Sequence, residues 1–431
     1  MAIKLHAPSR RELLLSSGVL FAWTCVPKLA LAEGRDPRLL VFILRGALDG
    51  LAAVAPVGDP DWIRLRGNQG LSLQGPPAAL PLNGFFALNP AMPNLHRMYK
   101  AGHATIVHAV SSPYRDRSHF DGQDVLESGL TRPGASESGW LNRALASLVP
   151  AGNVNPKGRE AFAVGPITPL VVRGAAPVMS WTPPRLPPPT DDMVMRLLDL
   201  YRHTDPALAH VLEERRDLAA IAREDGMLQP QRPQPHPPGP PAQQTQMRPP
   251  NRPVPGEAQR RYFAESAGAA AKFLARPDGP RIGALSFDGW DTHAAEGATN
   301  GRLSQLLGAL DGALAAVESG MGPAWNETVV AVMTEFGRTA RINGTDGTDH
   351  GTATIALLVG GTVRGGRVLA DWPGLKESDL RDGRDLKPTT DLRAILKGVL
   401  RDHVRVDEKA LASTVFPDSA MAKAMGGLVT V

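Results

Sequence analysis

The sequence Asp288-Gly-Trp-Asp-Thr-His293 is the first of three polar clusters that decide the predicted fold, and Thr334-Glu-Phe-Gly-Arg-Thr339 and Gly347-Thr-Asp-His-Gly351 follow it. Each cluster borders an apolar run typical of a buried strand, over residues 282–287, 328–333 and 353–361. Open α/β sheets bind ligands beyond the carboxyl ends of their strands. Because carboxylates and imidazoles are common metal ligands, the clusters predict a metal-dependent site at one edge of a sheet.

Apolar runs elsewhere in the chain extend this prediction to a whole domain. Residues 38–44 form a continuous apolar run that suits a central strand buried on both faces, and residues 104–110 form another. Leucines at helical spacing over 303–317 and an apolar face over 388–400 predict helices. Strands that alternate with helices indicate an α/β fold with a mostly parallel sheet covered on both faces.

The N-terminus has the features of an export signal. Arg10 and Arg11 precede an apolar run over residues 13–26, which is too short to span a bilayer comfortably, and Ala30-Leu-Ala32 supplies small residues for cleavage. We predict a twin-arginine signal peptide over residues 1–32, and the alternative of a basic N-terminal helix is less favoured. The mature protein would be periplasmic or secreted, would meet the twin-arginine export machinery, and would keep no stable membrane anchor.

Removal of this leader changes the charge and the metal chemistry of the chain. The whole chain carries 47 basic and 43 acidic residues, and the leader holds four of the basic ones and one acidic one. The mature chain is therefore close to neutral, which gives no support for nucleic-acid binding. Cys25, the one cysteine, also lies in the leader, so thiolate metal sites are excluded and oxygen and imidazole ligands remain.

A proline-rich tract interrupts the predicted domain, which otherwise covers residues 33–431. Residues 229–256 are rich in Pro, Gln and Arg and have few apolar residues, so they cannot form a packed core. We predict a mobile insertion there. A docking site for a partner is an alternative, but an inert surface insertion is favoured.

Two candidate site residues follow the first two predicted strands. Asp49 lies just past the strand over 38–44, where it is either a site carboxylate or the N-cap of the next helix. Ser118 follows the strand over 104–110 and starts a capping-box-like helix with Asp121. Its hydroxyl would lie at a positive helix N-terminus that favours an anionic substrate, although a plain N-cap serine is the simpler interpretation.

The remaining candidates lie in the three polar clusters. Asp291 and His293 are two positions apart, so in an extended loop both side chains project to the same side and can reach one ion. Glu335 follows the strand over 328–333, and His350 precedes the strand over 353–361 with Asp349 beside it. Each residue alone has a structural explanation of similar weight, but the order of the set along the strands favours a site.

This order resembles the alkaline phosphatase-like superfamily of phosphatases and sulfatases, and in particular an exported bacterial family of unknown function within it. The resemblance implies a three-layer α/β/α sandwich, Ser118 as the nucleophile, and a divalent metal ion (Zn, Mn, Mg or Ca) bound by Asp49, Asp291, His293, Glu335 and His350. The segments that carry it are Arg45-Gly-Ala-Leu-Asp-Gly-Leu51, Tyr114-Arg-Asp-Arg-Ser-His-Phe-Asp121, Gly289-Trp-Asp-Thr-His293, Thr334-Glu-Phe-Gly-Arg-Thr339, Gly347-Thr-Asp-His-Gly351 and Pro388-Thr-Thr-Asp391.

One departure from the superfamily pattern limits what the resemblance implies. Its phosphatases have histidine where this chain has Phe336, and phenylalanine cannot bind a metal, so a one-metal or degenerate site fits at least as well as a two-metal site.

The sequence therefore predicts an exported metal-dependent hydrolase of a phosphate or sulfate ester. Its substrate would be an anionic small-molecule or polymer ester, clamped by Arg338 or Arg117. The alternative is a non-catalytic exported binding or assembly protein that keeps the fold. Phe336 favours this alternative, and the retained acidic residues, serine and histidines favour the enzyme.

Overall fold

The computed structural model describes residues 35–148, 161–165, 167–181 and 256–430, with a few isolated residues between 198 and 213. The predicted signal peptide (1–32) and all but the last residue of the predicted proline-rich insertion (229–256) lie outside these residues. In the described part of the chain, no helix is both long and apolar enough to cross a membrane.

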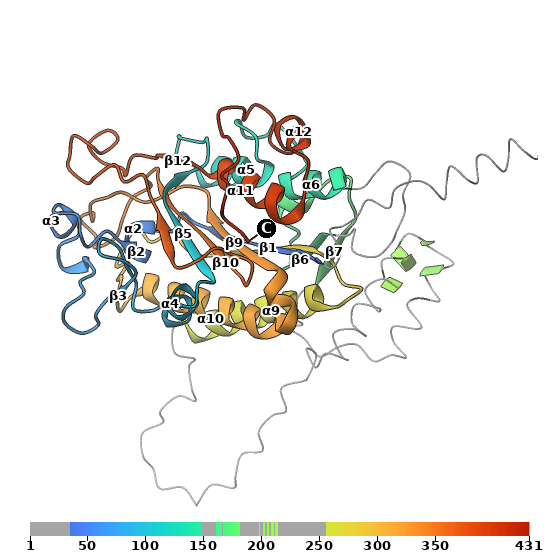
Figure 1. Ribbon diagram of the computed structural model, residues 1–431, viewed down its shortest axis with the longest axis horizontal. Coiled ribbons are helices and arrows are strands. Elements are labelled where there is room, and N and C mark those ends of the chain that lie inside the picture. Colours follow the sequence, from blue (N-terminus) through green and yellow to red (C-terminus); the bar gives the residue numbers. More distant parts are fainter. Residues whose placement is uncertain are drawn as a thin grey trace, which may run out of the picture. The chain divides into compact units, whose positions relative to one another are not determined.

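A nine-stranded sheet forms the centre of the fold (Figure 1). Neighbouring strands follow the order β11-β5-β10-β9-β1-β8-β6-β7, and β12 pairs with β5. Within this sheet, every described strand pair is parallel except the two pairs made by β10, which runs antiparallel to β5 and β9. The strands are β1 (Arg38–Arg45), β5 (Ala104–Ser111), β6 (Ala161–Val164), β7 (Val178–Trp181), β8 (Ile282–Asp288), β9 (Thr328–Thr334), β10 (Thr354–Val359), β11 (Arg367–Leu369) and β12 (Thr390–Asp391).

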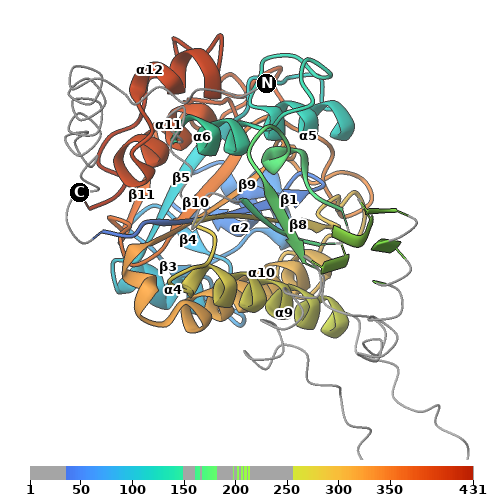
Figure 2. The same cartoon turned by 90° about the vertical axis from the view of Figure 1, so that its right-hand side faces the viewer.

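Helices cover both faces of this sheet, as Figure 2 shows. One layer contains α4 (Pro93–Lys100), α9 (Glu257–Ala275) and α10 (Arg302–Met321). The opposite layer contains α5 (His119–Ser128), α6 (Trp140–Leu148), α11 (Leu392–Val399) and α12 (Glu408–Ala410). The predicted three-layer α/β/α fold with a mostly parallel sheet is confirmed.

The sequence of β1 shows why the sheet is buried on both sides. Successive side chains of a strand point to opposite faces. Leu40, Phe42 and Leu44 pack in the core under α9 and α10, and the intervening Leu39, Val41 and Ile43 pack in the other core. None of these six side chains is more than 1% exposed, so a continuous apolar run satisfies both helix layers.

A smaller three-stranded sheet and two short helices lie between β1 and α4 in the chain. Its strand order is β2-β4-β3, with β2 (Val54–Ala55), β3 (Leu80–Pro81) and β4 (Ala87–Leu88). The short helices are α2 (Gly50–Ala53) and α3 (Trp62–Arg66).

Strand direction and register bring the polar clusters to one edge of the large sheet. Arg45 of β1 pairs with Asp288 of β8, and Leu44 lies opposite Thr334 of β9, so these three parallel strands end level with one another. Because β10 runs the other way, the loop before its first residue reaches the same edge. The carboxyl ends of β1, β8 and β9 therefore meet the start of β10, as the sequence predicted for a site.

Candidate metal centre

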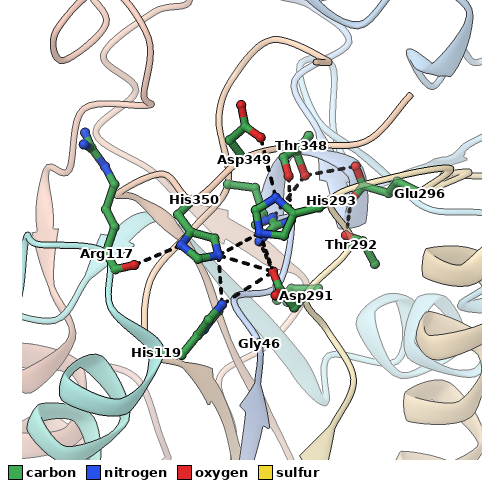
Figure 3. A network of polar contacts seen from close by, with 12 residues as sticks. Gly46, Arg117, His119, Asp291, Thr292, His293, Glu296, Thr348, Asp349 and His350 are labelled. Atoms are coloured by element: carbon green, nitrogen blue, oxygen red, sulfur yellow. Dashed lines mark hydrogen bonds and ion pairs between the residues drawn. The ribbon is translucent and has the colours of Figure 1, made fainter. Parts of the chain in front are cut away.

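Three imidazoles and one carboxylate converge at this edge of the sheet (Figure 3). His119 is the first residue of α5, Asp291 and His293 follow β8, and His350 precedes β10. His350 Nε2 lies 2.9 Å from His119 Nε2, 2.9 Å from His293 Nε2 and 3.3 Å from Asp291 Oδ1. Asp291 Oδ1 is in turn 3.0 Å from His293 Nε2 and 3.4 Å from His119 Nε2.

The outer nitrogen of each imidazole faces an oxygen acceptor. When Nδ1 donates a hydrogen bond, a neutral imidazole presents Nε2 as a lone-pair acceptor. The acceptors are the Arg117 carbonyl, 2.9 Å from His350 Nδ1, Glu335 Oε1, 2.8 Å from His119 Nδ1, and Asp349 Oδ1, 3.5 Å from His293 Nδ1. His119, Asp291 and His350 thus bring one ligand atom each within 4.8 Å of one another, and His293 places its Nε2 beside those of Asp291 and His350.

This donor set fits a cation. Histidines that bind metals usually donate their second N–H to a carboxylate or a backbone carbonyl, which is the arrangement seen here. The 3.3 Å and 3.4 Å separations of Asp291 Oδ1 from His350 and His119 match the roughly 3.3 Å between ligand atoms of a tetrahedral zinc site, whereas the 2.9–3.0 Å contacts of His350 with His119 and His293 and of Asp291 with His293 are shorter. The residues present are therefore suited to one divalent ion.

Glu335, which the sequence had suggested as a direct metal ligand, contacts His119 through the ring nitrogen that faces away from the converging atoms. It is fully buried, and its Oε1 accepts hydrogen bonds from His119 Nδ1 and the Gly46 amide, each at 2.8 Å, while Oε2 accepts one from Thr334. Burial opposes its ionisation, but the bonds from His119 and Gly46 outweigh burial and lower the pKa of Glu335. The same bond raises the pKa of His119. We therefore propose that Glu335 positions His119.

Glu335→Gln is expected to weaken metal binding about 10–100-fold, the usual cost of losing an outer-shell carboxylate. The amide keeps the volume and still accepts from Gly46, but it removes the charge that fixes the His119 tautomer. Chelator competition would measure the metal dissociation constant. The matched control is Glu318→Gln, a half-buried glutamate that pairs with the exposed Arg97. An unchanged dissociation constant for Glu335→Gln would contradict the positioning role.

Arg338 holds Asp291 in place and differs from the predicted anion clamp. Its side chain is fully buried; Nη1 donates to Asp291 Oδ1 at 2.7 Å, while Nε and Nη2 donate to Thr348. Burial favours the neutral acid, yet the bond and charge of Arg338 lower the pKa of Asp291. With its nitrogens engaged by Thr348 and Asp291, Arg338 fixes the position of the Asp291 carboxylate.

Glu296 is a buried acid behind the same loops. Thr348 and Thr292 each donate a hydrogen bond to its carboxylate. Burial, together with the charge of Asp49, raises the pKa of Glu296 to about 8.

Asp49, which the sequence predicted as a metal ligand, makes its contacts outside the cluster of converging side chains. Its carboxylate is 1% exposed, forms a two-pronged ion pair with Arg66, and accepts from the amides of Leu51 at 3.0 Å and Ala52 at 3.1 Å. It is the N-cap of α2. The alternative interpretation of Asp49 as a cap is the one these contacts support.

Ser118 lies beside the cluster at the N-cap position of α5. Its hydroxyl makes no capping hydrogen bond, its amide donates to Tyr114 Oη at 3.2 Å, and its residue is half-buried. A plain capping role, the simpler interpretation of the sequence, therefore does not describe this serine.

Phe336 packs directly on two of the converging imidazoles. Its ring centroid is 5.0 Å from that of His119, in a stacked arrangement, and 5.3 Å from that of His350. Ala47, Tyr114 and Val125 complete a small buried apolar cluster around it. The residue that departs from the phosphatase pattern thus fills the space beside the histidines with an apolar ring.

His119 belongs to the converging group but was not among the candidates that the sequence suggested. It directly follows Ser118 at the carboxyl side of β5, so its position was visible. Its role depends on Glu335, 216 residues later in the chain, and on His350, and only the folded structure brings them together.

Several solved structures of hydrolases are similar to this chain. The phosphonate monoester hydrolase of Agrobacterium radiobacter is 12% identical, with a TM-score of 0.33, over 78% of this chain and 68% of the hydrolase. A mutant of TAB5 alkaline phosphatase with bound Mg is 12% identical, with a TM-score of 0.35, over 78% and 95%. PsFucS1 sulfatase from Pseudoalteromonas sp. is 13% identical, with a TM-score of 0.32, over 84% and 68%. No curated protein sequence matches the chain.

A family model matches most of the chain, and its range includes all four residues whose ligand atoms converge. The match confirms the resemblance to a family of unknown function that the sequence had suggested. From its match over residues 98–415, the chain belongs to the family described as protein of unknown function (DUF1501).

Proposed function

We propose that this chain is a hydrolase of a phosphate or sulfate ester that depends on one divalent metal ion. His119, Asp291, His293 and His350 would hold the ion. The observation that supports this most is the convergence of three Nε2 atoms on Asp291 Oδ1 while each Nδ1 faces an oxygen acceptor. When bound, the ion would supply Lewis-acid polarisation of an ester oxygen.

The donor set also narrows the choice of ion. Mg²⁺ and Ca²⁺ prefer oxygen ligands, whereas imidazole suits Zn²⁺ and its first-row neighbours. Three imidazoles and one carboxylate therefore favour Zn²⁺ over the Mg²⁺ and Ca²⁺ that the sequence had left open. Phe336 on the histidine rings favours one ion over two.

Ser118 is the proposed nucleophile. Its oxygen would form a bond to phosphorus or sulfur as the ester oxygen leaves with a proton, and water would then release the inorganic anion. The position at the N-terminus of the ten-residue helix α5 favours negative charge on the transferred group. Ser118 directly precedes His119, one of the proposed metal ligands, so it lies next to the metal centre in the chain.

The proposal includes export through the twin-arginine route. The paired arginines and the cleavage motif of residues 1–32 support it, and the substrate would then be a periplasmic or extracellular anionic ester. A non-catalytic binding or assembly protein is the second candidate. The departure at Phe336 favours it.

The test compares wild type with Ser118→Ala on chromogenic phosphate and sulfate esters in the presence of Zn²⁺, Mn²⁺, Mg²⁺ or Ca²⁺. We expect turnover by wild type and a loss of at least about 10³-fold in kcat for the variant, because removal of a nucleophile removes the covalent route. Ser413→Ala is the control, since that exposed hydroxyl bonds only nearby backbone and side-chain oxygens. If the metal-loaded wild type hydrolyses neither ester class, the binding-protein candidate replaces the enzyme.

A further inference from the structure

Arg115 leaves part of its guanidinium unused at the carboxyl end of β5. Nη1 donates to the carbonyls of Ser112 and Tyr114, and the residue is half-buried. Among the residues that the structure describes, neither Nε nor Nη2 of Arg115 has a hydrogen-bond partner. Two donors of a partly desolvated cation are therefore available to a ligand.

Arg393 presents a second unused donor that is deeply buried. The residue is 9% exposed, and its Nε and Nη2 donate to Asp391 at 3.1 Å and 2.7 Å. Its Nη1 is buried and has no acceptor among the described residues. A buried charged donor without an acceptor is costly, so this atom points to a group that is supplied from outside the described chain.

The two arginines belong to the same end of the sheet. β12 pairs with β5 so that Asp391 lies opposite Ser111, and Arg115 folds back onto the neighbouring Ser112. Burial, together with the positive charges of Arg381 and Arg393, lowers the pKa of Arg115, whereas Asp391 acts in the other direction. Positive charge thus exceeds negative charge around Arg115.

We propose that Arg115 and Arg393 form a binding subsite for a phosphate or sulfate oxyanion. Guanidinium groups bind tetrahedral oxyanions through paired, charge-assisted hydrogen bonds, and the unused donors of both residues suit this geometry. The subsite uses none of the four residues of the metal centre. It lies at the same edge of the sheet, because Ser112 Oγ donates to the Glu335 carbonyl at 3.1 Å.

The test is calorimetric titration of inorganic phosphate and of sulfate into the full-length mature protein at low ionic strength. We expect Arg115→Gln to weaken binding of either anion about 10–100-fold, the cost of losing hydrogen bonds from a charged donor. Arg393→Lys should have a similar effect because lysine has no second fork nitrogen. Arg97→Gln is the matched control, since this exposed arginine pairs with Glu318 away from the subsite.

A variant of the metal centre separates this proposal from the proposed function. His350→Gln should keep the phosphate binding that depends on Arg115 even where it loses the metal and turnover. The opposite pattern, in which His350→Gln abolishes phosphate binding and Arg115→Gln leaves it unchanged, would overturn the subsite. Circular dichroism of each variant confirms that the fold is retained, and Arg115→Lys provides a milder change if Arg115→Gln fails to fold.

Discussion

His350→Gln is expected to strip the divalent metal from the purified chain. His350 Nε2 contacts each of the other three converging atoms, at 2.9 Å from His119 and His293 and at 3.3 Å from Asp291. Replacing His350 removes a ligand atom itself. The loss of metal affinity should therefore exceed the roughly 10–100-fold that follows from mutating a residue that only hydrogen-bonds to a ligand. Metal content after dialysis, measured by mass spectrometry, should fall from one ion per chain to a trace.

The control for this experiment is His96→Gln, a half-buried histidine whose Nε2 contacts the Pro81 carbonyl at 2.8 Å. It should keep the metal. A second variant, Asp291→Asn, preserves volume and still accepts a hydrogen bond from Arg338, so it tests the carboxylate charge with little risk to the fold. If His350→Gln and Asp291→Asn both carry as much metal as wild type, or if wild type binds none of the four ions, the metal centre is wrong.

The fold was largely predictable because its central strands are continuous apolar runs. The predicted strands at 38–44, 282–287 and 328–333 correspond to β1, β8 and β9, since only a run buried on both faces is apolar at every position. The direction of β10 was not predictable. An apolar run does not indicate whether its strand is parallel or antiparallel to its neighbours. The antiparallel direction of β10 is seen only in its pairing with β5 and β9.

The site was predictable where its residues are close in sequence or follow the strand order. Asp291 and His293 share one loop, and His350 reaches them because β10 starts at that edge. The roles of Asp49 and Glu335 were not predictable, because each depends on a partner distant in sequence or on a backbone amide. Arg66 takes the Asp49 carboxylate, and the Gly46 amide turns Glu335 toward His119.

Arg66→Met is expected to cost about 3–5 kcal/mol of unfolding free energy while leaving the metal in place, because it strands a buried carboxylate without its counter-ion. The Arg66 and Asp49 side chains are each 1% exposed. Arg66 also donates to the carbonyls of Ala340 at 2.8 Å and Thr339 at 3.2 Å, so the loss adds unsatisfied acceptors. Urea unfolding followed by tryptophan fluorescence would measure the change.

Two further variants show whether this pair is structural or belongs to the metal site. Arg97→Met breaks the exposed pair with Glu318 and should cost less than about 1 kcal/mol, since solvent screens exposed ion pairs. Asp49→Asn combined with Arg66→Met should recover part of the stability, because the buried charge is gone and the amide oxygen still accepts from Leu51 and Ala52. If the double variant instead loses the metal and recovers no stability, the Asp49–Arg66 pair belongs to the metal site and the structural role is wrong.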